Sequence, residues 1–209
     1  MADQGMVLVG RYRSPFTRRV AVSLRLLGFD YDLRPRTAWR HFDEITSLNP
    51  VGRVPILILE DGELIFDSSA ILDYLDGRVD PDRALVPEHG PTRRRVQTLG
   101  ALALGVIDKG RDLLYETVLR PEALRHGPWI ERWEGQIGSA LGAMETDAQA
   151  PWIAGERLTQ ADVTAGVMMD FTRLHHPRLL PQGQYRRLDE LSAAYGDVPA
   201  FAETMPEPE

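Results

Sequence analysis

The spacing of apolar residues divides the chain into two parts. Before about Leu75, short apolar runs alternate with stretches of helical periodicity, whereas beyond Pro91 only helical periodicity is found. A short apolar run bounded by turn signals is typical of a buried strand, and apolar residues three and four positions apart form one face of a helix. The pattern therefore predicts an α/β part followed by an all-α part.

The α/β part is predicted to follow the order β-α-β-α-β-β-α. Strands are predicted at residues 6–9, 31–34, 54–59 and 64–66, and helices near residues 16–27, 41–48 and 68–75. Gly28 and Asn49-Pro50 are expected to end the first two helices. Asp61-Gly62 predicts a hairpin turn, and Ser68 or Ser69 is expected to cap the third helix. The first two strands flank a helix and should pair in parallel, as in a thioredoxin-like domain.

The part beyond Pro91 is predicted to be a bundle of four amphipathic helices. Their apolar positions run from Val96 to Val118, Trp129 to Met144, Leu158 to Leu174 and Leu188 to Tyr195. The segment 78–90 has the glycine and proline content of a linker, so the predicted domains are residues 1–77 and 91–209. Thr159 and Asp162 match a capping box, and the tail from Thr204 is expected to fray.

Composition excludes several classes of protein. A hydrophobic content of 43% over 209 residues is enough for one or two packed cores. The net charge of −7 argues against a nucleic-acid-binding protein. No apolar run is long enough to span a membrane and the first residues lack a secretory pattern, so we expect a cytoplasmic protein. The chain has no cysteine, which excludes disulfides, zinc–thiolate sites and a cysteine nucleophile of its own.

Four segments carry a resemblance to a known family. They are Arg11–Val20, Asn49–Leu57, Phe66–Leu75 and Gly155–Val163. In this order and at this spacing, the chain resembles the cytosolic glutathione transferases from about Met6 to Phe201. Its serine motif is similar to that of the tau, omega and several bacterial groups. The resemblance implies that the first domain binds glutathione as cosubstrate, that no metal is needed, and that the protein forms a homodimer.

The resemblance also implies a transferase of detoxification, which joins the glutathione thiol to a small hydrophobic electrophile. A specialised glutathione-dependent dehalogenase, lyase or isomerase is an alternative. A non-catalytic scaffold of the same fold is another, and the presence of Ser14, Val54-Pro55 and Asp67-Ser68 argues against it.

Ser14 is the candidate catalytic residue. It ends the first strand and begins the first helix, where a hydroxyl and the helix N-terminus together stabilise a thiolate. Serine before proline is also a purely structural start for a helix. Tyr12 is the alternative catalytic residue, because other branches of the family use a tyrosine near the end of this strand.

The resemblance places the main glutathione contacts in two further segments. The backbone N–H and C=O of Val54, before a cis Pro55, would pair with the cysteinyl backbone of the tripeptide. Ser68 would hold the γ-glutamyl α-carboxylate at a helix N-terminus, and Asp67 would attract the ammonium group. The structural alternatives are a proline that begins a strand and an ordinary helix cap.

The remaining candidates are less specific. Phe16 is placed in the glutathione site by its position in the serine motif. His41 and Arg53, together with Arg40, are candidate partners of the glycyl carboxylate, and a solvated surface role is the alternative for each.

The electrophile pocket is expected between the two domains. Asp108, Arg111 and Tyr115 lie near one another at helical spacing and are its candidate lining. An ion-paired, solvent-facing helix surface is the alternative interpretation.

Overall fold

The structure is a computed structural model that describes residues 5–206. Its contacts divide the chain into two compact units. The first holds residues 1–88 and 197–209, and the second holds residues 89–196. The segment that follows Asp197 therefore packs with the N-terminal part, whereas the sequence pattern assigned it to the helical domain.

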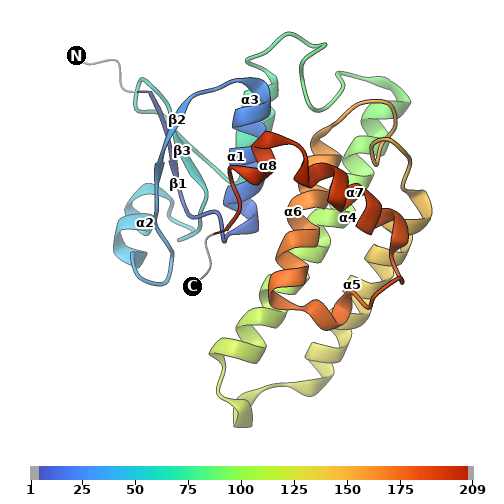
Figure 1. Cartoon of the computed structure of the whole chain (residues 1–209). Helices are drawn as coiled ribbons and strands as arrows, with labels where there is room; N and C mark the ends of the chain where they lie inside the picture. The colour runs from blue at the N-terminus through green and yellow to red at the C-terminus, as the bar shows by residue number, and fades with distance from the viewer. Residues whose placement is uncertain (1–4, 207–209) are drawn as a thin grey trace. The chain divides into compact units, whose positions relative to one another are not determined.

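The first unit is a four-stranded sheet with helices, as a thioredoxin-like domain requires (Figure 1). Its elements are β1 (Met6–Val9), α1 (Pro15–Leu27), β2 (Tyr31–Arg34), α2 (Phe42–Leu48), β3 (Ile56–Ile58), β4 (Leu64–Phe66), α3 (Ser68–Asp76) and α8 (Pro199–Ala202). The strand order is β2-β1-β3-β4. β1 and β2 pair in parallel, while β3 pairs with β1 and β4 in antiparallel fashion. The predicted order of elements, the parallel pair and the hairpin are confirmed.

Both faces of this sheet are covered, because alternate residues of each strand point to opposite sides. Val9 and Ile56 pack with Ile45 of α2 on one face. On the other face α1 and α3 lie side by side (Figure 1), and Leu24 and Ile71 are among their fully buried residues. The sheet is thus held between α2 and the pair α1–α3.

The register of the strands brings three chain segments together at one end of the sheet, where β1 and β4 end and β3 begins. Val9, Ile56 and Phe66 lie in one row across β1, β3 and β4. Val9 is the last residue of β1, Ile56 is the first of β3, and Phe66 is the last of β4. The residues that follow β1, precede β3 and follow β4 therefore meet at this end, and all of the strongest candidate site residues belong to these segments.

The helix ends follow local chemistry, with one correction. Ser14 caps α1, Pro15 is its first residue, and Gly28 ends it in a left-handed conformation with φ 81°. For α3 the cap is Asp67, because its carboxylate accepts a hydrogen bond of 2.8 Å from the N–H of Ser69. The expectation that Ser68 or Ser69 would cap this helix is wrong, since both lie inside its first turn.

The C-terminal segment packs against α1. Arg18, which is 1% exposed, donates hydrogen bonds to the carbonyl of Phe201 at 3.3 Å and to the sulfur of Met205 at 3.0 Å. Thr204 is buried, and its hydroxyl donates to the carbonyl of Ala200 at 2.8 Å. The expectation that the chain frays from Thr204 is therefore wrong for Thr204 and Met205, because these contacts are invisible to a local sequence pattern. Residues 207–209 lie outside the described residues.

The second unit contains only helices among its regular elements, as predicted. They are α4 (Gly90–Leu114), a π-helical turn (Tyr115–Leu119), a 3₁₀ turn (Glu122–Leu124), α5 (Gly127–Asp147), α6 (Gln160–His175), a 3₁₀ turn (Pro177–Leu179) and α7 (Arg186–Gly196). α4 packs against both α5 and α6. Within residues 5–206, no helix combines the length and the apolar character needed to cross a membrane.

A buried carboxylate anchors the start of α6. Asp162 is fully buried and accepts hydrogen bonds from the N–H and hydroxyl of Thr159, the N–H of Ile153 and the hydroxyl of Tyr195, at 2.8 to 3.0 Å. Burial raises the pKa of Asp162, and these hydrogen bonds oppose that rise. The predicted capping box is thus part of a larger buried network.

Replacing Tyr195 with phenylalanine is expected to lower the free energy of unfolding by about 1–2 kcal/mol. The change removes one donor to a buried carboxylate and keeps the ring stacked on Trp152, whose centroid lies 6.2 Å away. Urea denaturation measures the loss. Tyr185→Phe is the matched control, because its hydroxyl accepts a hydrogen bond from the neutral amide of Gln184 and its removal should cost less. Equal losses in the two variants would contradict the anchoring role of Asp162.

Candidate functional site

Ser14 caps helix α1 and still has a hydroxyl proton with which to donate a hydrogen bond. It is half-buried at the N-terminus of the 13-residue helix α1, and its Oγ accepts a hydrogen bond of 3.4 Å from the N–H of Thr17. A serine hydroxyl has one proton to donate as well as its lone pairs. Because the cap uses only a lone pair, the structural and the catalytic interpretations of Ser14 are compatible.

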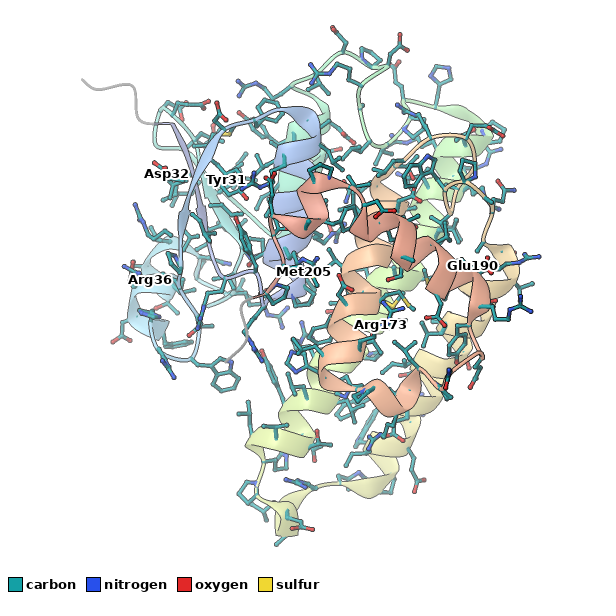
Figure 2. All side chains as sticks on the ribbon, viewed as in Figure 1. Tyr31, Asp32, Arg36, Arg173, Glu190 and Met205 are labelled. Atoms are coloured by element: carbon teal, nitrogen blue, oxygen red, sulfur yellow. The ribbon has the colours of Figure 1, made fainter. Side chains whose placement is uncertain are left out.

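The hydroxyl of Tyr12 forms a hydrogen bond on the side of β1 that faces β2. Its hydroxyl lies 2.8 Å from the hydroxyl of Tyr31 on β2. Figure 2 labels Tyr31, which pairs with Met6 at the end of β1 farthest from Ser14. Burial, and then the contact with Tyr12, raises the pKa of Tyr31, so the Tyr31 hydroxyl keeps its proton at neutral pH. Since β2 and β3 flank β1 on opposite sides, this geometry directs the Tyr12 hydroxyl away from β3.

Val54 is half-buried and lies two residues before the start of β3. Its side chain packs against the cluster of Val9, Ile45 and Ile56, which fixes the residue in place. Among residues 5–206, nothing hydrogen-bonds to its backbone N–H or C=O. The Val54–Pro55 peptide bond is cis, as the resemblance implied. An unpaired backbone donor and acceptor on one residue are groups that the backbone of a short peptide can pair with.

Asn49, which the sequence pattern marked only as the end of a helix, is also a positioning residue for the loop that follows it. It is 3% exposed, and its side-chain amide donates to the carbonyl of Arg53 at 2.9 Å. Its side-chain oxygen accepts from the N–H of Val51 at 3.0 Å. These two bonds fix the loop that leads into Val54. The available signal was the Asn-Pro dipeptide, because asparagine commonly bonds to backbone groups of the turn that it begins.

Asp67 has an unusual backbone conformation. It has φ 67° and ψ 129°, and it is the one residue other than glycine with a positive φ among those described. Such a conformation costs of the order of 1–3 kcal/mol and persists mainly where function or packing requires it. Its side chain is exposed beside the N-terminus of α3, so the carboxylate can meet a cation while it caps the helix.

Replacing Asp67 with asparagine is expected to weaken glutathione binding roughly fivefold. Asparagine tolerates positive φ and can still cap Ser69, so the change removes the charge alone. Calorimetric titration with glutathione and with glutaryl-cysteinylglycine, which lacks the γ-glutamyl ammonium, measures the effect. The analogue should bind the variant and the wild type equally, and a fivefold loss for both ligands would contradict the predicted contact.

The remaining residues that were predicted to contact glutathione belong to several helices and loops of the first unit. Ser68 is 2% exposed at the first position of α3, and Phe16 is half-buried in the first turn of α1. His41 caps α2 by position, and its Nδ1 accepts from the N–H of Thr37 at 3.3 Å, which leaves Nε2 to carry the proton of the neutral ring. Arg53, next to Val54, has an exposed side chain, and so does Arg40. Which of the three holds the glycyl carboxylate stays a prediction.

The candidate electrophile residues lie in the second unit. Arg111 on α4 forms ion pairs with Asp108 at 3.1 Å and with Asp112 at 2.8 Å. Tyr115 begins the π-helical turn and is 39% exposed. These ion pairs are those that the alternative interpretation expected, and a role in binding an electrophile stays a prediction. No group of His, Asp or Glu side chains within residues 5–206 is arranged to hold a metal ion.

Comparisons with known proteins identify the family. A family model described as the N-terminal domain of glutathione S-transferase matches residues 8–83. The maleylacetoacetate isomerase of Pseudomonas aeruginosa is 32% identical over 211 residues, which cover 96% of this chain and 96% of that protein. The chain belongs to the cytosolic glutathione transferase family.

Solved glutathione transferases share the fold over nearly the whole chain. The crystal structure of one from Methylobacillus flagellatus, with glutathione bound, is 30% identical, has a TM-score of 0.89, and covers 97% of this chain and 100% of its own. One from Methylobacterium radiotolerans, in complex with glutathione sulfonate, is 26% identical with a TM-score of 0.91 and covers 98% and 96%. The thioredoxin-like and helical parts of the predicted fold are thus confirmed, while the tau- or omega-like subclass stays a prediction.

Proposed function

We propose that this glutathione transferase is a glutathione-dependent isomerase, which converts a cis double bond of a small unsaturated keto acid such as maleylacetoacetate into the trans form. The observation that carries the proposal is the full-length relative named maleylacetoacetate isomerase. Sequence analysis held isomerisation as an alternative to conjugation, and the relatives favour that alternative. A role in detoxification and assembly as a homodimer stay expectations from the resemblance.

The residues at this end of the sheet fit the parts of glutathione. The open backbone of Val54 suits the cysteinyl unit, and Asp67 with the N-terminus of α3 suits the γ-glutamyl charges. Ser14, the N-cap of α1, lies in the segment that follows β1, and in this proposal its hydroxyl faces the cysteinyl sulfur. Glutathione, when bound by these residues, would supply a thiolate for reversible addition to the conjugated double bond.

Ser14 favours that thiolate by donating a hydrogen bond from its hydroxyl to the sulfur. An unperturbed thiol has a pKa of about 8.5, so most of it is protonated at pH 7. Each unit by which the pKa falls corresponds to about 1.36 kcal/mol in favour of the anion. The N-terminus of α1, which Ser14 caps, would add to the effect, because its partial positive charge favours an anion. The protein thus contributes electrostatic stabilisation and positioning.

Whether glutathione is consumed distinguishes isomerisation from conjugation. Purified protein is incubated with glutathione and maleylacetoacetate, and the cis and trans acids and the free thiol are measured over time. We expect the trans isomer to accumulate with no net loss of thiol, beyond the rate without enzyme. A parallel reaction with 1-chloro-2,4-dinitrobenzene measures conjugation. Stoichiometric loss of thiol without isomerisation would support conjugation, and glutathione binding without either reaction would support the scaffold.

A further inference from the structure

A buried arginine meets the predicted carboxylate-binding serine. Arg19, in the second turn of α1, is 5% exposed. Its Nη1 donates a hydrogen bond to Ser68 Oγ at 3.4 Å, and Ser68 is itself 2% exposed. Because α1 and α3 pack against each other, this contact fixes the beginning of α3 beside the first two turns of α1.

The bond constrains how Ser68 can use its hydroxyl. A guanidinium only donates hydrogen bonds, whereas a hydroxyl has one proton and two lone pairs. Arg19 occupies a lone pair of Ser68 Oγ, so the proton of Ser68 points elsewhere and remains available to an acceptor. A carboxylate at this position needs a hydrogen-bond donor, and the Ser68 hydroxyl can supply one.

The charge of Arg19 acts in the same direction. A guanidinium is always charged and is expensive to bury, so its place in a protein interior has a strong effect on nearby groups. The free N–H groups at the N-terminus of the nine-residue helix α3 are also partially positive. Two positive features therefore meet at Ser68, and both favour an anion there.

We propose that Arg19 is a positioning residue for glutathione recognition, which orients the Ser68 hydroxyl toward the γ-glutamyl α-carboxylate and makes the site selective for ligands that carry this group. The inference rests on the proposed glutathione site and adds a residue to it. Arg19 acts through Ser68 and does not itself touch the reacting sulfur.

Three ligands test the selectivity of the site. They are glutathione, 4-aminobutanoyl-cysteinylglycine, which lacks the α-carboxylate, and glutaryl-cysteinylglycine, which keeps the carboxylate and lacks the ammonium. Calorimetric titration gives the Kd of each for the wild type and for Arg19→Gln. Arg18→Gln is the matched control, because Arg18 is the neighbouring buried arginine and contacts Phe201 and Met205.

Arg19→Gln is expected to weaken glutathione and the glutaryl analogue about tenfold and to leave the 4-aminobutanoyl analogue within about twofold. Arg18→Gln should lower the melting temperature without changing the ratio of the three Kd values. Equal weakening of all three ligands by Arg19→Gln, or no weakening, would overturn the inference. A wild type that fails to bind glutathione at all would overturn the proposed function first.

Arg19→Lys keeps the test decisive if the glutamine variant does not fold. Lysine retains the charge and loses the fork of guanidinium donors. A smaller loss than tenfold, confined to the two carboxylate-bearing ligands, supports the inference. A loss shared by all three ligands contradicts it.

Discussion

Replacing Ser14 with alanine is expected to lower kcat at pH 7 by about a hundredfold, while the Kd of glutathione changes by less than about threefold. The hydroxyl has its lone pair engaged by the N–H of Thr17, and its proton is the part that a sulfur anion would use. Without that donor, the pKa of the bound thiol should rise toward about 8.5. Binding is expected to survive, because the contacts proposed at Val54 and at the N-terminus of α3 do not involve Ser14.

The pH dependence of kcat distinguishes this role from a loss of structure. In the variant, kcat should rise as pH increases through the raised thiol pKa, whereas the wild type should already be level at pH 7. Ultraviolet absorbance of the thiolate in the complex reports the same pKa directly. An unchanged pH profile in Ser14→Ala would contradict the role of Ser14.

Tyr12→Phe is the matched control for Ser14→Ala. Its hydroxyl pairs with that of Tyr31 on the β2 side of β1, so its removal should leave the thiol pKa unchanged. If Tyr12→Phe abolishes turnover and Ser14→Ala does not, the tyrosine is the thiolate stabiliser and our assignment is wrong.

Gly10→Ala is expected to lower the free energy of unfolding by about 3–5 kcal/mol, the largest loss that we predict for a single change. Gly10 has φ +150°, and a Cβ on it would lie 2.3 Å from Oγ1 of Thr17 on α1. Both the backbone conformation and the contact oppose a side chain. Urea denaturation measures the loss.

Two further variants separate the two causes. Gly62→Ala tests conformation alone, because Gly62 has φ +90° with nothing within 4 Å of the added Cβ, and it should cost much less than Gly10→Ala. Thr17→Ala removes the two closest atoms, so the double variant Gly10→Ala/Thr17→Ala should recover more than about 1 kcal/mol relative to additivity. Strict additivity would contradict a steric origin.

Local chemistry explains why most of the first unit was predictable from sequence. Pro15 and Gly28 set the ends of α1, and Asp61-Gly62 sets the hairpin. The strand predicted from Val54 was too long, since β3 begins at Ile56 after a proline that lacks an N–H. The association of Ser14, Val54 and Asp67 at one end of the sheet was predictable only through the family resemblance, because it depends on strand register.

Contacts between distant parts of the chain explain what the sequence analysis missed. Arg18 bonds to a carbonyl 183 positions away, so the helix α8 and the burial of Thr204 had no local signal. Arg19 did have a local signal, because it lies three positions after Phe16, at the border of the apolar face of α1. A charged residue at such a position is a candidate for a buried interaction, but the partner, Ser68, follows only from the packing of α1 on α3.

The docking of residues 199–206 on α1 has a consequence for dissecting the protein. A fragment that stops at residue 88 would uncover the side of α1 that Phe201 and Met205 now cover. The guanidinium of Arg18 would then lose the carbonyl and the sulfur that accept its hydrogen bonds. The thioredoxin-like half is therefore built from both ends of the polypeptide. A split version would need residues 197–206 supplied as a separate peptide.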